Sequence, residues 1–166
     1  CADDLGPELG KVGTKFIRNM LHGISSSRSV NLTDISQALD EKISLHATHK
    51  RLSRNLEDPQ LAANLADRLL RLGAGKVGLD TRLIIHLYEL NKKYARKMEY
   101  LSKPGELDDA GFKVCEILAS EPESETYIPL IVHVWSNQVP GFVSDADEIR
   151  KTVLSVQAAT GNRGMF

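Results

Sequence analysis

The sequence predicts an α+β protein in which a helical N-terminal part precedes a β-sheet part. Before residue 74, apolar residues recur at helical spacing in four segments. From residue 80 onward, three runs rich in branched apolar residues have the length and polar flanks typical of strands. One more helical segment follows them. We therefore divide the chain into a helical domain, 1–76, and a sheet-containing domain, 77–166.

Four helices are predicted in the first domain. The first covers 8–24, where apolar residues form one stripe. The second begins after Asn31 and the third, 45–56, begins after Ser44, because the side-chain oxygens of both residues can cap a helix N-terminus. The fourth has Pro59 near its first turn and ends at Gly73, which favours a helix C-terminus.

Three strands and one helix are predicted in the second domain. The strand-like runs are TRLIIHLYEL, AGFKVCEILAS and TYIPLIVHVWS, which begin at residues 81, 110 and 126. Ser144 then caps a helix whose first turn is acidic, a charge that favours the positive end of the helix dipole. The final GNRGMF looks like a turn into a fourth strand, of which only Met165 and Phe166 are present.

The charge of the chain is unevenly distributed. Residues 1–103 contain 17 Lys and Arg against 12 Asp and Glu, whereas residues 104–166 contain 4 against 10. A basic first half is compatible with a partner that presents a phosphate backbone, and a solvated charged surface is the alternative. No window resembles a membrane helix or a signal peptide, so we expect an intracellular protein with no membrane partner.

Residues 31–56 have the arrangement of a helix-turn-helix, in which a short helix and a tight connection precede a polar, basic helix. Such a second helix can lie in the major groove, where its early residues contact base edges and its basic residues contact phosphates. The candidate DNA contacts in it are His46, Thr48, His49, Lys50, Arg51 and Arg54. The alternative is that this basic face contacts only solvent. His46 and His49 have metal-ligand spacing, but no third ligand lies nearby.

A second basic run directly follows the first strand and would lie at one end of the sheet. It comprises Lys92, Lys93, Arg96 and Lys97, which could hold a phosphate backbone or could form a solvated helix face. Two histidines lie inside strand-like runs. For His133 the expected role is a core or edge side chain with one hydrogen-bond partner, whereas His86 needs more context.

The segment GISSSRSVNLTDISQALDEKISLHATHKRLSRNL, residues 23–56, resembles the N-terminal DNA-binding region of bacterial insertion-sequence transposases of the DDE type, in the IS-four-like group. LIIHLYELNKKYARKMEYL, GFKVCEILASEPESETYIPLIVHVWS and GNRGMF resemble the opening of the RNase H-like catalytic domain of those transposases. The resemblance covers nearly the whole chain in the same order. It implies a helix-turn-helix domain followed by a truncated β-β-β-α start of an RNase H-like domain.

The resemblance also implies a catalytic centre. In the family, an Asp on the first strand, an Asp after the fourth strand and a Glu on a later helix hold two Mg²⁺ ions for DNA strand cleavage and transfer. The first strand typically reads Asp-Leu-Ser/Thr-Asp, and the matching residues here are His86, Leu87, Tyr88 and Glu89. His86 thus occupies the first catalytic position. A neutral imidazole suits Mg²⁺ poorly, and Glu89 should point to the opposite face of the strand.

These observations predict a transposase-derived protein that binds double-stranded DNA, such as transposon ends, in the bacterial cytoplasm at the nucleoid. We expect the chain to bind no Mg²⁺, to hold no other metal and to be catalytically incomplete alone. It could form a homodimer or associate with a full-length transposase. Two alternatives stay open: a non-catalytic regulator that competes with intact transposase, and a small α/β module with no role at DNA.

Overall fold

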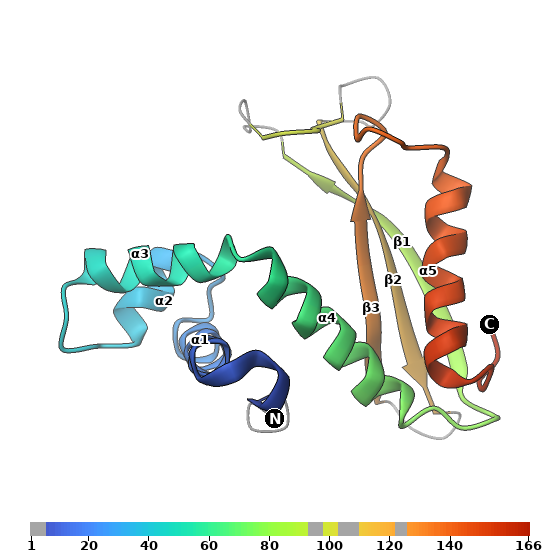
Figure 1. The fold of residues 1–166 in the computed structure, drawn as a ribbon, viewed down its shortest axis with the longest axis horizontal. Coiled ribbons are helices and arrows are strands. Elements are labelled where there is room, and N and C mark those ends of the chain that lie inside the picture. The colour runs from blue at the N-terminus through green and yellow to red at the C-terminus, as the bar shows by residue number, and fades with distance from the viewer. Residues whose placement is uncertain (1–5, 93–97, 103–109, 122–125) are drawn as a thin grey trace. The chain divides into compact units, whose positions relative to one another are not determined.

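The computed structural model describes residues 6–92, 98–102, 110–121 and 126–166, and the chain divides into two compact units. The helical unit is Cys1–Arg68 and the sheet unit is Leu69–Phe166. The described residues form five helices and one three-stranded antiparallel sheet (Figure 1). The predicted mixture of helices followed by an antiparallel sheet and a further helix is therefore confirmed.

The helical unit contains α1 (Gly6–Ser27), α2 (Leu32–Ala38), α3 (Leu45–Leu56) and the first part of α4 (Pro59–Ala74). Its core consists of five buried apolar side chains: Phe16, Ile17, Ile35, Leu52 and Leu61. α1 and α2 approach closely at Gly23, where a Cβ atom would lie 2.5 Å from the Ile35 side chain. The absence of a side chain at Gly23 allows this approach.

Side-chain caps begin α2 and α3 at the predicted positions. The Asn31 side chain accepts a hydrogen bond from the backbone N–H of Thr33, at 2.9 Å. The Ser44 hydroxyl accepts one from the backbone N–H of Ala47, at 3.3 Å. Between the helices, Asp40 has a φ of 42°, a left-handed conformation that reverses the chain in a short turn. The succession of α2, a short turn and α3 thus follows from local signals.

The sheet unit contains β1 (Arg82–Asn91), β2 (Gly111–Ser120) and β3 (Tyr127–Trp135), in the order β1-β2-β3. All three predicted strands are confirmed. Both pairs are antiparallel, and all ten residues of β1 pair with β2 without a bulge, so that His86 lies opposite Glu116. β2 and β3 pair with one irregularity between Ile117 and Leu118.

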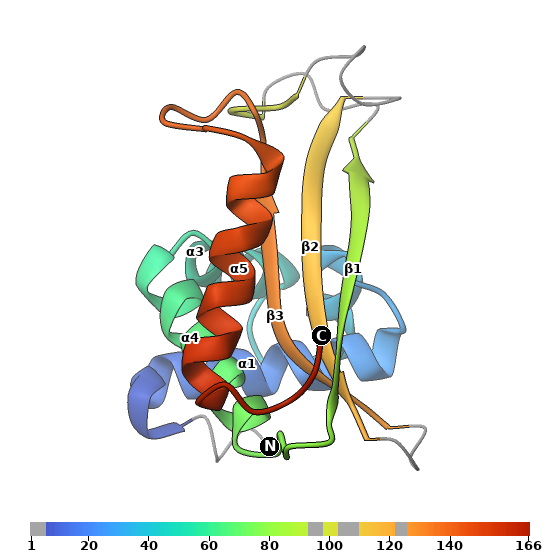
Figure 2. The ribbon, with the colours of Figure 1, turned by 90° about the vertical axis from the view of Figure 1, so that its right-hand side faces the viewer.

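Helix α5 (Asp145–Thr160) packs along one face of the sheet (Figures 1 and 2). As predicted, Ser144 caps it, and the hydroxyl accepts a hydrogen bond from the backbone N–H of Asp147 at 3.1 Å. The core between the helix and the sheet is formed by buried side chains: Val77, Leu83, Cys115, Ile117, Ala119, Leu130, Trp135 and Val156. The free thiol of Cys115 is fully buried, and this burial raises its pKa.

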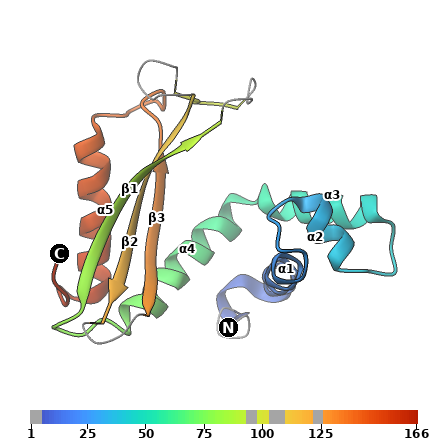
Figure 3. The same cartoon turned by 180° about the vertical axis from the view of Figure 1, so that it is seen from behind.

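The last residues return to the sheet beside β1. After the left-handed Gly161, Met165 forms a parallel bridge with Arg82. The backbone N–H of Leu83 donates to the carbonyl of Met165 at 2.6 Å, and that of Met165 donates to the carbonyl of Thr81 at 2.8 Å. Figure 3 shows β1 from behind, with the chain end at its side. Among the described residues this contact is an isolated parallel bridge and not a fourth strand, so the predicted fourth strand stays a prediction.

Candidate nucleic-acid interface

Helix α3 has two faces of different character. Thr48 is 1 % exposed and Leu52 is 0 % exposed, so this face belongs to the core of the helical unit. The opposite face carries polar residues at helical spacing that line one shallow hollow: His46, His49, Lys50, Ser53, Arg54 and Glu57. Four of the six predicted DNA contacts are therefore brought together on one face of α3.

The cations of this face are available for an external partner. Lys50 and Arg54 are exposed, and within the described part of the chain neither makes a hydrogen bond or an ion pair through its side chain. The imidazoles of His46, which is exposed, and of His49, which is half-buried, likewise make no hydrogen bond or ion pair within the described residues. Among the described residues, the one carboxylate that lines the hollow is that of Glu57, which accepts a hydrogen bond from the Ser53 hydroxyl at 3.2 Å.

The other two predicted contacts, Thr48 and Arg51, bind a carboxylate of their own unit. One oxygen of Glu41 accepts hydrogen bonds from the Thr48 hydroxyl at 3.0 Å and from the Arg51 guanidinium at 2.6 Å. Burial raises the pKa of Glu41, but the hydrogen bonds from Arg51 and Thr48 outweigh it and hold the pKa below its usual value. Thr48 and Arg51 thus hold Glu41, and with it the turn between α2 and α3, against α3.

The second predicted basic group lies mostly outside the residues that the structure describes. Lys93, Arg96 and Lys97 are not among the described residues. Lys92 directly follows β1, and its backbone N–H donates to the carbonyl of Ala110 at 2.7 Å. This bond extends the pairing of β1 with the start of β2, and it places Lys92 at the end of the sheet, as predicted.

His86 lies in the middle of β1 with 61 % of its side chain exposed. Its Nδ1 atom is 3.7 Å from a carboxylate oxygen of Glu116 on the neighbouring strand, and its ring centroid is 5.0 Å from that of Tyr88. Glu89 differs from His86 by an odd number of positions on a strand without a bulge, so the two side chains leave opposite faces. Glu89 therefore does not share a metal site with His86.

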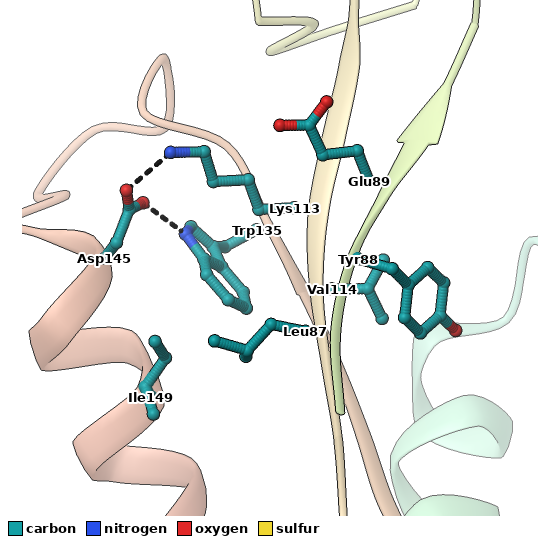
Figure 4. Close-up of a pocket in the computed structure, with 8 residues that line it drawn as sticks. All are labelled: Leu87, Tyr88, Glu89, Lys113, Val114, Trp135, Asp145 and Ile149. Carbon is teal, nitrogen blue, oxygen red and sulfur yellow. Dashed lines mark hydrogen bonds and ion pairs between the residues drawn. The ribbon is translucent and has the colours of Figure 1, made fainter. Parts of the chain in front are cut away.

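The face of β1 that carries Glu89 borders a pocket next to α5 (Figure 4). Asp145, at the start of α5, accepts hydrogen bonds from the Lys113 ammonium at 2.5 Å and from the Trp135 indole N–H at 2.9 Å. Burial raises the pKa of Asp145, yet these hydrogen bonds lower it further than burial raises it. Figure 4 shows Leu87 directed toward Ile149 in this pocket. Asp145 thus anchors α5 to two strands.

His133 has the predicted structural role of a strand histidine with a single hydrogen-bond partner. Its Nε2 atom is 2.7 Å from a carboxylate oxygen of Glu148 on α5, and its ring stacks on Trp135 with centroids 5.5 Å apart. Hydrogen bonds from Lys151 and His133 lower the pKa of Glu148. The His133–Glu148 pair therefore attaches the first turns of α5 to β3.

The described residues do not present the donors that Mg²⁺ prefers. Around His86 they offer one imidazole nitrogen and the Glu116 carboxylate, whereas Mg²⁺ takes oxygen ligands in octahedral geometry. In the described ranges no three His, Cys, Asp or Glu side chains cluster as metal ligands would. His46 and His49 thus have no third ligand within those ranges.

Sequence reasoning missed the partners of these residues. It did not identify Glu41, Glu116 or Asp145, because each meets its partner through a turn, a strand register or a helix contact. No protein-family model matches the chain, and no curated protein matches it in sequence. Among the described helices, none combines the length and the apolar character needed to cross a membrane. The geometry of the two units is therefore the basis for a functional proposal.

Proposed function

We propose that this chain is a DNA-binding protein derived from an insertion-sequence transposase of the DDE type, in which α2 and α3 act as a helix-turn-helix. The observation that carries the proposal is the exposed face of α3. Its Lys50 and Arg54 side chains have no partner in the described part of the protein, and they share one hollow with two histidines. An exposed, unpaired basic helix face after a tight turn suits the major groove and its phosphates.

The opposite face of α3 supports this proposal. Leu52 and Thr48 anchor the helix in the core. Arg51, the remaining cation of the helix, forms an ion pair with Glu41. A recognition helix has to be held rigidly while its polar side chains stay available. We therefore assign the DNA contacts to His46, His49, Lys50 and Arg54, and we assign Thr48 and Arg51 to positioning the helix.

A double substitution, Lys50→Ala with Arg54→Ala, is expected to weaken DNA binding and to reduce its salt dependence. Each phosphate contact contributes a slope of about −0.9 to log K against log salt concentration, so losing two contacts should reduce the slope by about 2. Fluorescence anisotropy with a labelled mixed-sequence duplex, titrated at several salt concentrations, measures both quantities.

The matched control removes two exposed lysines from other parts of the chain, Lys11→Ala with Lys76→Ala. It changes the net charge by the same amount but leaves α3 intact. We expect the control to keep most of the affinity and the slope of the parent chain. Equal losses in both double variants would mean that general charge drives binding, and absence of binding at low salt would refute the proposal.

We further propose that the sheet unit is the opening of an RNase H-like domain. The supporting observations are the antiparallel order β1-β2-β3, the helix α5 on one face, and the parallel bridge of Met165 on the free edge of β1. The order β-β-β-α, followed by one parallel bridge, supports the proposal because the β-β-β-α-β order of that domain begins in the same way. In the family the reaction is metal-dependent DNA cleavage and strand transfer, with an aspartate at the position that His86 takes here.

Replacing His86 with aspartate tests this assignment. The His86→Asp variant places a second carboxylate opposite Glu116, and two like charges on paired strand positions should destabilise the sheet unit by about 0.2 to 1 kcal/mol. Added Mn²⁺ should recover this loss, because a divalent cation bound only by the folded state stabilises it. Thermal unfolding followed by the fluorescence of Trp135, with and without Mn²⁺, measures both effects.

The control for this test is His86→Asn, which has nearly the same shape as aspartate but no charge. We expect it to lack the destabilisation and to show no larger response to Mn²⁺ than the parent chain. If Mn²⁺ shifts all three proteins equally, or shifts none of them, position 86 does not accept a metal-binding carboxylate and the assignment of the sheet unit loses its support.

A further inference from the structure

His46 and His49 lie on the same exposed face of α3 as the two unpaired cations. The histidines are three residues apart, and Lys50 is four residues after His46, so these side chains are neighbours on the helix surface. All of them line the same hollow as Arg54. A ligand that contacts the cations of this face therefore meets both imidazoles as well.

We infer that DNA binding by this face is linked to protonation of His46 and His49, so that affinity rises as pH falls. This inference rests on the proposed DNA-binding function. Histidine is the side chain that ordinarily changes charge between about pH 5 and 8. With both imidazoles neutral, the hollow is lined by two cations and one carboxylate; with both protonated, it is lined by four cations and one carboxylate. Phosphates favour the protonated form.

Among the charged groups on and around α3, we expect His46 and His49 to be the ones whose protonation changes the DNA affinity as pH falls. α1 and α2 pack against α3, and the turn that precedes α3 adds further charges. Together they contribute Glu8, Lys11, Lys15, Arg18, His22, Asp34, Asp40, Glu41 and Lys42. His22 is the histidine that the control variant removes. Asp34 accepts a hydrogen bond from Ser29 at 2.7 Å. Glu41 keeps its charge because its pKa is lowered, and it is bonded to Thr48 and Arg51.

None of these groups neutralises the histidines in the part of the chain that the structure describes. Neither imidazole makes an ion pair or a hydrogen bond there, so protonation adds charge that is not cancelled by a bonded carboxylate. Glu57 is the carboxylate of the same face, and it is bonded to Ser53. The added charge is therefore directed to an external anion, and the phosphodiester backbone is the anion that the proposed function supplies.

The test is an anisotropy titration of a labelled duplex at fixed salt and at several values of pH. For the parent chain, we expect the Kd to fall by about tenfold or more between about pH 8 and about pH 5.5, because bound DNA takes up protons. At the lower pH the slope against log salt should be steeper by about 1 to 2, as one or two more phosphates are neutralised.

The decisive variant is His46→Gln with His49→Gln, which keeps polar side chains but cannot be protonated. Because both residues are assigned as DNA contacts, it should bind less tightly than the parent chain at the higher pH, and its Kd should not fall at the lower pH. The control is His22→Gln, which removes an exposed histidine of α1 and should keep the full pH response. Circular dichroism at both pH values establishes that each protein stays folded.

The outcomes separate this inference from the function on which it rests. Absence of binding at every pH refutes both. Binding that does not change with pH, or a pH response that the double variant retains, refutes the linkage and leaves DNA binding standing. Loss of the response in the double variant, with the response retained in His22→Gln, supports the linkage.

Discussion

Leu52→Ala is expected to lower the free energy of unfolding of the helical unit by about 2 to 5 kcal/mol, because it removes a large side chain from a closed core. Leu52 is 0 % exposed and packs in one cluster with Phe16, Ile35 and Leu61. The substitution leaves a cavity that these neighbours fill only in part. Urea unfolding followed by far-ultraviolet circular dichroism measures the change.

Leu56→Ala is the matched control on the same helix. Leu56 is 53 % exposed and lies one turn after Leu52, so the same chemical change removes little buried surface. We expect a loss of about 0.5 kcal/mol or less, as for other surface substitutions. If both variants lose the same stability, α3 is not anchored through Leu52, and the division of the helix into a core face and an exposed face would be wrong.

The helices could be predicted because their signals are local. Asn31 and Ser44 cap the next helix through atoms two and three residues away, and Pro59 opens α4. The first helix is bounded by Gly6 and Ser27 and is kinked at Gly10, whose φ of 63° and ψ of 176° are not helical. It continues past the predicted end at residue 24, since the polar residues after Ile24 extend the helix without adding to its apolar stripe. Ends without a capping residue in the sequence are the ones that pattern reasoning places least well.

The candidate interface could be predicted only in part, for a reason that one residue illustrates. Thr48 looks like any polar residue of a basic helix, but it is buried against Glu41, which lies seven positions earlier in the turn. Arg51 has the same partner. Which polar side chains of α3 stay exposed depends on how the turn folds back, and helical spacing carries no information about that contact.

The surroundings of His86 could not be predicted for a similar reason. The strands themselves follow from composition, but the pairing of His86 with Glu116 depends on the register between β1 and β2. A shift of one residue would bring another side chain opposite His86 and would move every side chain of the strand to the other face. The register is set by packing against α5, which lies far along the chain.

Ile117→Ala is expected to lower the free energy of unfolding of the sheet unit by about 2 to 5 kcal/mol. Ile117 is 0 % exposed and lies in the core cluster that includes Trp135 and Val156. Trp135 is the single tryptophan of the chain, so its fluorescence reports the unfolding of this core directly. Urea unfolding of parent and variant, followed at the tryptophan emission, measures the difference.

Ile85→Ala is the control, because Ile85 pairs with Ile117 across the two strands and is 39 % exposed. We expect it to cost about 1 kcal/mol or less, since much of its side chain already contacts water. The comparison tests the register as well as the core. If Ile85→Ala lowers the free energy of unfolding as much as Ile117→Ala, Ile117 is not the more buried residue of the pair. The register that places His86 opposite Glu116 would then be wrong.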